Sequence, residues 1–408
     1  MKCFKKLSAV VMAILLTVCC MIPTGADAMP EDEIPEGVVV TATRPDAVLD
    51  AQTVKAPNAI LIEPTTGTVI FEKNPDDRVA PASVTKIMSL LLIMEALERG
   101  EIQLDDQVAC SEHASSMGGS QIWLEVGEVM SVNDLLKAVA VGSANDATVA
   151  LAEFLAGSED AFVRMMNERA AQLSMVNTNY MNASGLDEDN HYTSARDTVF
   201  AASELIKHQL VINYSTIWMD TLRGGETELV NTNKLVQFYK GITGLKTGTT
   251  DKAGCCLTAT AERDGLKLVA SVFGSKSSDE RFSAARALLD FGYANFVILT
   301  PELPSEEIIV PVKRGTVSEI EIIAGEIPSL LLKKGNEKNL VYTTEIPEHL
   351  TAPIAQNESV GRVVITAQNG ESVGEYPLVA ARPVERLTLW KAFILMLESY
   401  TSTGASDK

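Results

Sequence analysis

Residues 80–86 read APASVTK, and they open an apolar stretch that runs to residue 97. Pro81 suits the entry of a helix, because the N–H that proline lacks is not needed in the first turn. Ser83 and Lys86 stand three positions apart, so their side chains share one face of the predicted helix. The apolar surroundings would desolvate the amine and favour its neutral form, which can take the proton of the serine hydroxyl. The stretch therefore predicts an activated serine nucleophile, although a capped helix with a surface lysine fits the same residues.

Two more short motifs follow along the chain. Ser143 and Asn145 fall on a predicted loop between two helices, where side chains can point into a cleft. Lys246 and Thr247 precede Gly248 in a predicted strand, and a glycine at that point lets a ligand approach the backbone closely. Each of the motifs S-x-x-K, S-x-N and K-T-G is weak alone, but the ordered set of three is specific.

The ordered set resembles the low-molecular-mass penicillin-binding proteins, which are serine D-alanyl-D-alanine carboxypeptidases of bacterial cell walls. The resemblance covers nearly the whole mature chain, including residues 231–233, the loop at 182–191 and a trailing β-rich region. It implies an α/β (α+β) serine β-lactamase/transpeptidase-like domain with an antiparallel sheet and flanking helices. A small all-β domain and a C-terminal amphipathic helix would follow, and no cofactor is implied.

The resemblance also implies a role for each motif residue. Ser83 would attack the carbonyl between two D-alanines and become acylated, with Lys86 as the general base. Ser143 would relay a proton to the leaving amine, while Asn145 would bind the peptide and hold Lys86. The predicted substrate-binding residues are Lys246, Thr247, Gly248, Thr249 and Arg281.

A substrate that ends in a carboxylate needs cations and hydroxyls at one end of its cleft. The side chains of Lys246, Thr247 and Thr249 provide them, and a guanidinium such as that of Arg281 suits a carboxylate especially well. Arg281 is assigned by position alone, and pairing within its own helix is the alternative. The backbone N–H groups of Ser83 and Thr249 would form the oxyanion hole.

Other functions fit the same motifs. A β-lactamase or D,D-endopeptidase on the same fold is one alternative, and a non-catalytic β-lactam sensor or wall-binding protein is another. The second motif is S-A-N instead of the S-D-N of class A β-lactamases, and no E-x-x-x-N element supplies a deacylating glutamate. The complete motif set argues against lost catalysis. We therefore expect a carboxypeptidase that takes peptidoglycan stem peptides as substrate and β-lactams as covalent inhibitors.

The N-terminus predicts export. Lysines precede an apolar run from Leu7 to Ile22, and residues 26–28 form an A-x-A cleavage site. We expect residues 1–28 to be a signal peptide, since the apolar run is short for a membrane span and ends in helix breakers. The predicted location is the outer face of the cytoplasmic membrane.

Composition argues against a nucleic-acid partner, a disulfide framework and a metal site. The formal net charge of −20 argues against nucleic acid, which needs a basic surface. After the signal peptide, three cysteines remain, and an odd number is no disulfide framework, so Cys110, Cys255 and Cys256 are expected to be buried free thiols. The four histidines show no metal-ligand spacing, and no metal is expected.

The chain divides into a series of expected regions. An acidic lead-in would span residues 29–50, the catalytic domain 51–297 and the β-rich domain 298–383. The tail, residues 384–408, gathers its apolar side chains on one arc of a helix that starts near residue 385. This pattern favours a helix lying in a membrane surface, and packing on the β-rich domain is the alternative.

Local patterns predict individual elements of the catalytic domain. They include a hairpin over 59–71, a helix capped by Ser131 with Asp134, further helices over 162–173, 198–210 and 281–292, and strands over 254–261 and 266–273.

Overall fold

The computed structural model describes residue 49 and residues 53–301, 307–368 and 370–394. The predicted signal peptide, nearly all of the acidic lead-in and the end of the predicted tail lie outside these ranges. Within them, no helix is long and apolar enough to cross a membrane.

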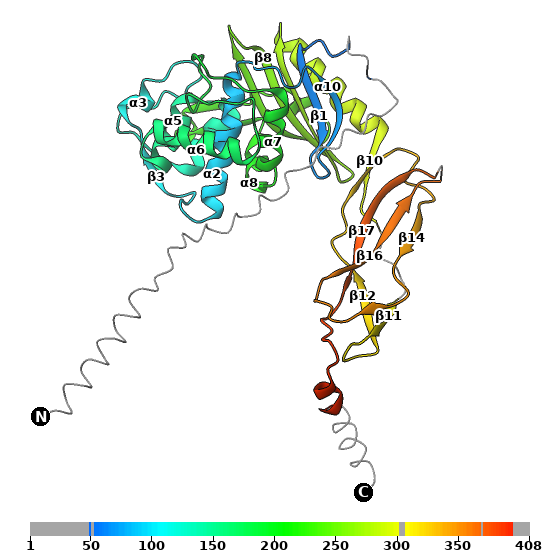
Figure 1. Cartoon of the computed structure of the whole chain (residues 1–408). Coiled ribbons are helices and arrows are strands. Elements are labelled where there is room, and N and C mark those ends of the chain that lie inside the picture. The colour runs from blue at the N-terminus through cyan, green and yellow to red at the C-terminus, as the bar shows by residue number, and fades with distance from the viewer. Residues whose placement is uncertain (1–48, 50–52, 302–306, 369, 395–408) are drawn as a thin grey trace, which may run out of the picture. The chain divides into compact units, whose positions relative to one another are not determined.

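A five-stranded sheet with strand order β2-β1-β9-β8-β7 forms the centre of the catalytic region, and all of its neighbouring strands are antiparallel (Figure 1). The hairpin predicted over residues 59–71 is confirmed as β1 and β2. Its turn is held by the buried carboxylate of Glu63, which accepts hydrogen bonds from the N–H groups of Thr65 and Thr66. The strands are β1 (Asn58–Glu63), β2 (Thr68–Lys73), β7 (Ile242–Thr250), β8 (Gly254–Arg263) and β9 (Leu266–Ser275).

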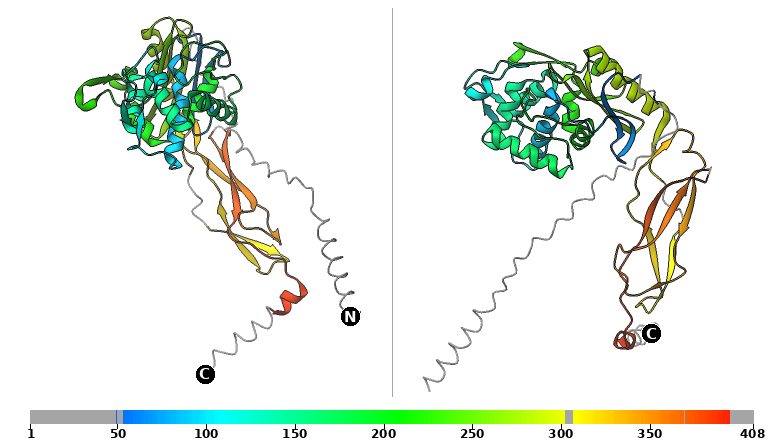
Figure 2. Two further views of the ribbon diagram at one scale, coloured as in Figure 1. Left: turned by 90° about the vertical axis from the view of Figure 1, so that its left-hand side faces the viewer. Right: turned by 45° about the horizontal axis from the view of Figure 1, so that its top comes forward.

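Helices cover both faces of this sheet (Figures 1 and 2). Helix α10 (Ser278–Asn295) packs on one face, and the opposite face carries the larger helical cluster around α2 (Lys86–Glu98). Consecutive residues of β1 point to opposite sides, so Ile60 belongs to the α2 core and Leu61 to the α10 core. Every residue of β1 is buried as a result, and the sheet is a rigid base for residues at its edge.

The helical cluster follows the predicted pattern with one correction. Ser131 caps α4 by accepting the N–H of Asp134 at 3.1 Å, as expected. The single helix predicted over residues 198–210 is wrong, because two helices separated at 206–208 occupy this region. Here Ser194 caps the earlier helix and His208 stands in extended conformation before the later one. The helices are α3 (Glu112–Ser115), α4 (Val132–Lys137), the π-turn η2 (Ala138–Gly142), α5 (Asn145–Ala156), α6 (Glu159–Gln172), α7 (Ala195–Leu205), α8 (Gln209–Ser215) and α9 (Leu235–Phe238).

Two small hairpins complete the catalytic region. One pairs β3 (Gln107–Ala109) with β4 (Val129–Ser131), and the other pairs β5 (Met219–Leu222) with β6 (Thr227–Val230) around the turn η3 (Arg223–Gly225). Cys110 and Cys256 are buried free thiols, as predicted, but Cys255 is partly exposed, and it lies near the start of β8.

The described residues from 307 to 380 form strands and turns without a helix, so this region is all β, as predicted. A six-stranded sheet has the order β14-β16-β17-β12-β11-β15, and it has its own core around Val363, Ile365, Tyr376 and Leu378. The strands are β10 (Phe296–Leu299), which pairs with β13 (Leu330–Lys333), and β11 (Ile308–Lys313), β12 (Glu319–Ala324), β14 (Val341–Glu345), β15 (Leu350–Thr351), β16 (Ser359–Thr366) and β17 (Ser372–Ala380).

The start of the predicted tail helix needs correction. Val384 is buried in the core of the β-rich region and bridges to Ile354, and Arg386 bridges to Gly315. This main-chain pairing keeps the segment extended, so helical conformation begins at residue 389 instead of near 385.

Candidate active site

The nucleophile candidate lies on a tight turn that leads directly into α2. Ser83 belongs to the 3-10 turn η1 (Ala82–Thr85), where the sequence predicted the first turn of an α-helix. Ala82 has a φ of +47°, a conformation that side-chain-bearing residues seldom adopt. This local geometry keeps Ser83 partly exposed while its neighbours Ala82 and Val84 are buried.

The amine of Lys86 meets three oxygens at close range. Its Nζ lies 2.9 Å from Ser83 Oγ, 2.5 Å from Asn145 Oδ1 and 2.7 Å from the carbonyl oxygen of Ser184. Asn145 Oδ1 and the Ser184 carbonyl can only accept. A neutral amine has two hydrogens for them and leaves its lone pair directed at the serine hydroxyl.

The neutral form of Lys86 is favoured by its surroundings. The side chain is fully buried, and burial is the main reason that its pKa lies well below the ordinary 10.5. The positive charge of Lys246 lowers this pKa further, while Asp146 opposes the change. The geometry and the lowered pKa both leave the lone pair of Lys86 available to the Ser83 hydroxyl.

A second amine lies across the site. Lys246 of β7 donates to Ser143 Oγ at 2.9 Å, and Ser143 sits in a left-handed conformation (φ +64°) directly after the π-turn η2. Burial, and next the charge of Arg281, lower the pKa of Lys246 to about 7. The two motifs predicted to share a cleft are thus in direct contact.

Strand β7 passes very close to the nucleophile. A Cβ added at Gly248 would lie 3.0 Å from the Ser83 nitrogen and 3.0 Å from the Pro81 oxygen, so a side chain at this position would press against the turn η1. Thr247 donates to Thr232 Oγ1 at 2.7 Å, which adds a hydroxyl from the segment before the strand. The glycine therefore sets the separation between strand and serine.

Arg281 reaches the end of β7, although sequence placed it there by position alone. Its Nη1 donates to the Gly248 carbonyl at 3.0 Å and to Thr249 Oγ1 at 2.8 Å, and its Nη2 donates to Ser278 Oγ at 3.3 Å. Since α10 begins at Ser278, Arg281 lies in its first turn, as expected, with the helix starting slightly earlier than predicted.

The loop over residues 182–191 contributes groups that sequence reasoning did not assign. The Ser184 carbonyl binds Lys86, and Gly185 (φ +89°) fits so tightly that an added Cβ would lie 1.9 Å from the Ala82 oxygen. His191 Nδ1 accepts the Met181 N–H at 3.0 Å, so its Nε2 donates to Thr85 Oγ1 at 2.9 Å. Every residue has a main-chain carbonyl, so the residue type at 184 could not indicate this contact. Only the length and polarity of the loop could have drawn attention to it.

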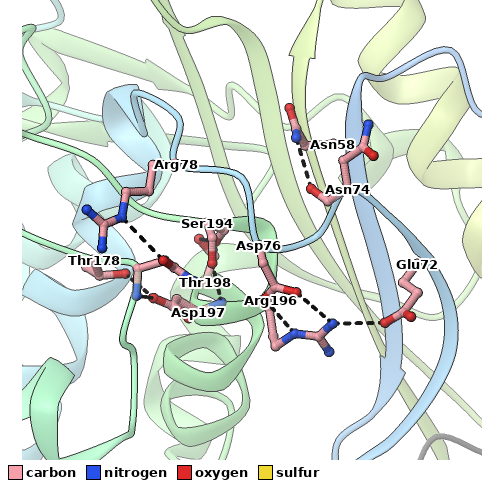
Figure 3. A network of polar contacts seen from close by, with 11 residues as sticks. Asn58, Glu72, Asn74, Asp76, Arg78, Thr178, Ser194, Arg196, Asp197 and Thr198 are labelled. Atoms are coloured by element: carbon pink, nitrogen blue, oxygen red, sulfur yellow. Dashed lines mark hydrogen bonds and ion pairs between the residues drawn. The ribbon is translucent and has the colours of Figure 1, made fainter.

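A polar network fixes the segment that leads to the nucleophile (Figure 3). Arg196 pairs with Asp76 at 2.8 Å and with Glu72 at 2.9 Å, which ties β2 and the following turn to α7. Nearby, Asp197 accepts the hydroxyl of Thr178 at 2.7 Å. These contacts hold the chain on both sides of the Ser184 loop in place relative to the turn η1.

The geometry defines a class of protein. The structure places Ser143 on the predicted loop, but Asn145 is the first residue of α5 instead of a loop residue. A serine paired with a buried neutral lysine, a loop serine followed by an asparagine at a helix start, and a lysine-bearing edge strand together form the site of the serine acyl-transfer enzymes that bind penicillin. Comparison with known proteins agrees. The D-alanyl-D-alanine carboxypeptidase family matches residues 41–277, and the C-terminal domain of penicillin-binding protein 5 matches residues 305–386.

Individual relatives resemble most of the chain. D-alanyl-D-alanine carboxypeptidase DacF of Bacillus subtilis is 41% identical over 337 residues, covering 81% of this chain and 86% of its own. DacC of Escherichia coli is 34% identical, with 84% and 88% covered. The crystal structure of penicillin-binding protein 5 from Haemophilus influenzae superposes with a TM-score of 0.74 at 29% identity, covering 82% of this chain and 98% of that one.

The chain belongs to the peptidase S11 family of D-alanyl-D-alanine carboxypeptidases. It is a serine-type carboxypeptidase of the penicillin-binding class. The predicted fold class is confirmed as well, since both the mixed α/β catalytic domain and the all-β domain match.

Proposed function

We propose that this chain removes the terminal D-alanine from peptidoglycan stem peptides through an acyl-enzyme on Ser83. The observation that carries this proposal is the 2.9 Å contact between Lys86 Nζ and Ser83 Oγ, with the other two contacts of the amine made to groups that can only accept. A lysine in this setting can activate a serine without any histidine.

Acylation would proceed in the following way. Lys86 takes the Ser83 proton, and Oγ bonds to the carbonyl carbon between the two D-alanines. The N–H groups of Ser83 and Thr249 donate to the resulting oxyanion. Each such donor typically lowers the activation free energy by about 3–4 kcal/mol. The C–N bond then breaks, and the leaving amine takes a proton relayed by Ser143. The close approach of β7 at Gly248 supports this arrangement of donors.

The terminal carboxylate would bind at the end of β7. Lys246 supplies positive charge, while Thr247 and Thr249 supply hydroxyls, and Asn145 binds the peptide. Arg281 would act in part through Thr249, since it already donates to that hydroxyl. Water attacks the ester carbonyl, the bond to Ser83 Oγ breaks, and the shortened peptide leaves with the serine regenerated.

The test is D-alanine release from diacetyl-L-Lys-D-Ala-D-Ala by the purified mature protein. We expect Ser83→Ala to abolish release. Ser203→Ala is the matched control, since that hydroxyl bonds the Val199 carbonyl within α7, and it should leave release unchanged. Full activity of the Ser83→Ala protein would overturn the proposal.

Penicillin distinguishes the alternatives from this proposal. A carboxypeptidase should hold a persistent penicilloyl group on Ser83, visible by mass spectrometry of the labelled peptide. Rapid turnover of penicillin would favour a β-lactamase. Labelling without hydrolysis of any peptide would favour the non-catalytic sensor.

We also propose export and attachment to the outer face of the membrane. Residues 1–28 would be the signal peptide, followed by the lead-in at 29–50, the catalytic domain at 51–297, the β-rich domain at 298–383 and the membrane-associating tail beyond it. Exposed apolar side chains support the membrane-associating role of the tail. Leu389 is 94% exposed, and the rings of Trp390 and Phe393, which stack on each other, are also largely exposed. Exposed apolar side chains at a terminal helix suit a lipid surface.

Deleting residues 388–408 tests this attachment. The deletion spares Val384, which the β-rich core needs, and should move the protein from membranes to the soluble fraction with peptide hydrolysis intact. Unchanged membrane association would exclude the tail as the anchor.

A further inference from the structure

Trp123 stands out among the large apolar side chains. It is 75% exposed, while its neighbours Ile122 and Leu124 are buried. Its φ is +59°, a left-handed conformation that is a genuine outlier for a bulky residue. Folding alone gives no reason to hold an indole in water in a strained conformation, and such outliers are typical of functional sites.

The segment that carries Trp123 continues directly from the active site. The Asn145 side chain donates to the Gly118 carbonyl at 2.6 Å, and the Asn145 N–H donates to the Ser120 carbonyl at 2.7 Å. Consecutive Cα atoms are 3.8 Å apart, so the Trp123 Cα lies within about 11 Å of that of Ser120. The exposed indole is therefore carried by a segment that bonds directly to Asn145 of the site.

Polar anchors hold the backbone on both sides of the indole. The buried carboxylate of Asp146, next to Asn145 in the chain, accepts the N–H groups of Ile122 at 3.2 Å and Leu124 at 3.0 Å. Arg223 donates to the Ile122 carbonyl at 2.9 Å and pairs with Glu128 at 2.7 Å. The indole is thus presented by a fixed frame that is tied to the S-x-N motif, and little entropy is lost when a ligand packs on it.

We propose that Trp123 is a substrate-contacting residue that packs on the part of the stem peptide preceding the two terminal D-alanines. An extended chain spans about 3.3–3.6 Å per residue, so three residues before the scissile dipeptide are about as long as the segment from Ser120, which bonds Asn145, to Trp123. An indole offers a broad apolar surface to the aliphatic backbone and side-chain carbons of that segment. The inference rests on the proposed function, and it concerns preference among substrates instead of the reaction itself.

The test compares substrates of increasing length with Trp123→Ala and Trp123→Phe proteins. The substrates are N-acetyl-D-Ala-D-Ala, the free stem pentapeptide and the disaccharide-pentapeptide. For Trp123→Ala we expect kcat/KM for both pentapeptides to fall roughly tenfold, with a much smaller change for the capped dipeptide and for acylation by penicillin. Trp123→Phe should recover most of the loss because it restores an aromatic surface.

The outcomes separate this inference from the proposed function. Failure of the unmodified protein to release D-alanine from any of these substrates would overturn the function itself. With the function intact, an equal loss on all three substrates would overturn the inference, because it would indicate a damaged active site. A loss confined to the disaccharide-pentapeptide would overturn the assignment to the stem peptide.

Fluorescence gives a second measurement of the contact. Trp218→Phe and Trp390→Phe leave Trp123 as the one tryptophan of the chain, and Ser83→Ala prevents turnover. Adding the pentapeptide to this protein should shift the emission of Trp123 to shorter wavelength, whereas N-acetyl-D-Ala-D-Ala should not. Saturable binding of the pentapeptide without any spectral change would contradict the proposed contact.

Discussion

The catalytic region and the β-rich domain place their charged side chains in opposite environments. In the catalytic region, Lys86 and Lys246 are buried with no carboxylate among the described side chains that bond to either amine. In the β-rich domain, Arg362 is 53% exposed and lies between Glu345 and Glu375 on neighbouring strands. Paired surface charges cost little and contribute little, whereas buried unpaired amines oppose folding and are retained for what they do.

The largest effect should come from removing the base. Lys86→Met should lower kcat/KM for D-alanine release by roughly 10²–10⁴-fold, because proton transfer from Ser83 is lost. Penicillin acylation should slow to a similar degree. Stopped assays with fluorescent penicillin, together with circular dichroism to check the fold, would measure this. Rapid acylation by the variant would show that another group accepts the proton.

A smaller effect is expected where β7 meets the nucleophile. Gly248→Ala should slow acylation roughly 10²-fold, because the new methyl group displaces the strand from Ser83. Gly224→Ala lies in a hairpin turn where an added Cβ has open space, and although its φ of +66° carries some strain, it should leave acylation nearly unchanged. Equal rates for both variants would contradict the close approach of strand and serine.

The pKa of Lys246 predicts a pH dependence. With a pKa of about 7, the amine loses its charge as pH rises through 7, so kcat/KM should decline on the alkaline side as carboxylate binding weakens. Lys246→Arg keeps the charge, and in that variant the decline should move to higher pH. A profile of kcat/KM from pH 5 to 10 measures both proteins. An alkaline limb that is the same in both would assign it to a different group.

The same group predicts how stability depends on pH. Its folded-state pKa lies below the ordinary 10.5, so the unfolded chain binds more protons between pH 7 and 10.5. The contribution of Lys246 to the free energy of unfolding therefore rises with pH across this window. Lys246→Met should remove that contribution, and thermal melts of both proteins at pH 6.5 and 9.5 would show a larger gain for the variant at pH 6.5. If the variant gained the same stability over the unmodified protein at both pH values, the lowered pKa of Lys246 would be contradicted.

The smallest effect is expected in the β-rich domain. Arg362→Ala breaks two exposed ion pairs, and it should change the melting temperature by about 2 °C or less and leave hydrolysis unaffected. A calorimetric scan checks this, and a much larger drop would mean that surface pairing contributes more to this sheet than its exposure indicates.

Sequence predicted the parts of the molecule where residue type carries the information. The hairpin of β1 and β2, the cap at Ser131 and the three motifs follow from spacing and side-chain chemistry. The break between α7 and α8 could not be predicted from apolar spacing, because the pattern continues through residues 206–208 and only the local conformation at His208 interrupts it.

The same limit applies to the site. The pairing of Ser83 with Lys86 follows from their spacing, but the Ser184 carbonyl that completes the surroundings of Lys86 belongs to a distant loop and to the main chain. The early extended pairing of Val384 and Arg386 also depends on partners far away in sequence. Long-range main-chain contacts are what the sequence left unassigned.

The fit of Gly185 against Ala82 has a consequence for how the site tolerates change. The contact to Lys86 is made by the main-chain carbonyl of residue 184, so the side chain at 184 matters less than the path of the main chain. That path is possible only because residue 185 is a glycine and has no Cβ. In a library randomised at both codons, survivors selected for hydrolysis should show several small residues at 184 and glycine alone at 185. The hydrogen bond from Lys86 to the carbonyl of residue 184 thus depends on the residue type at position 185.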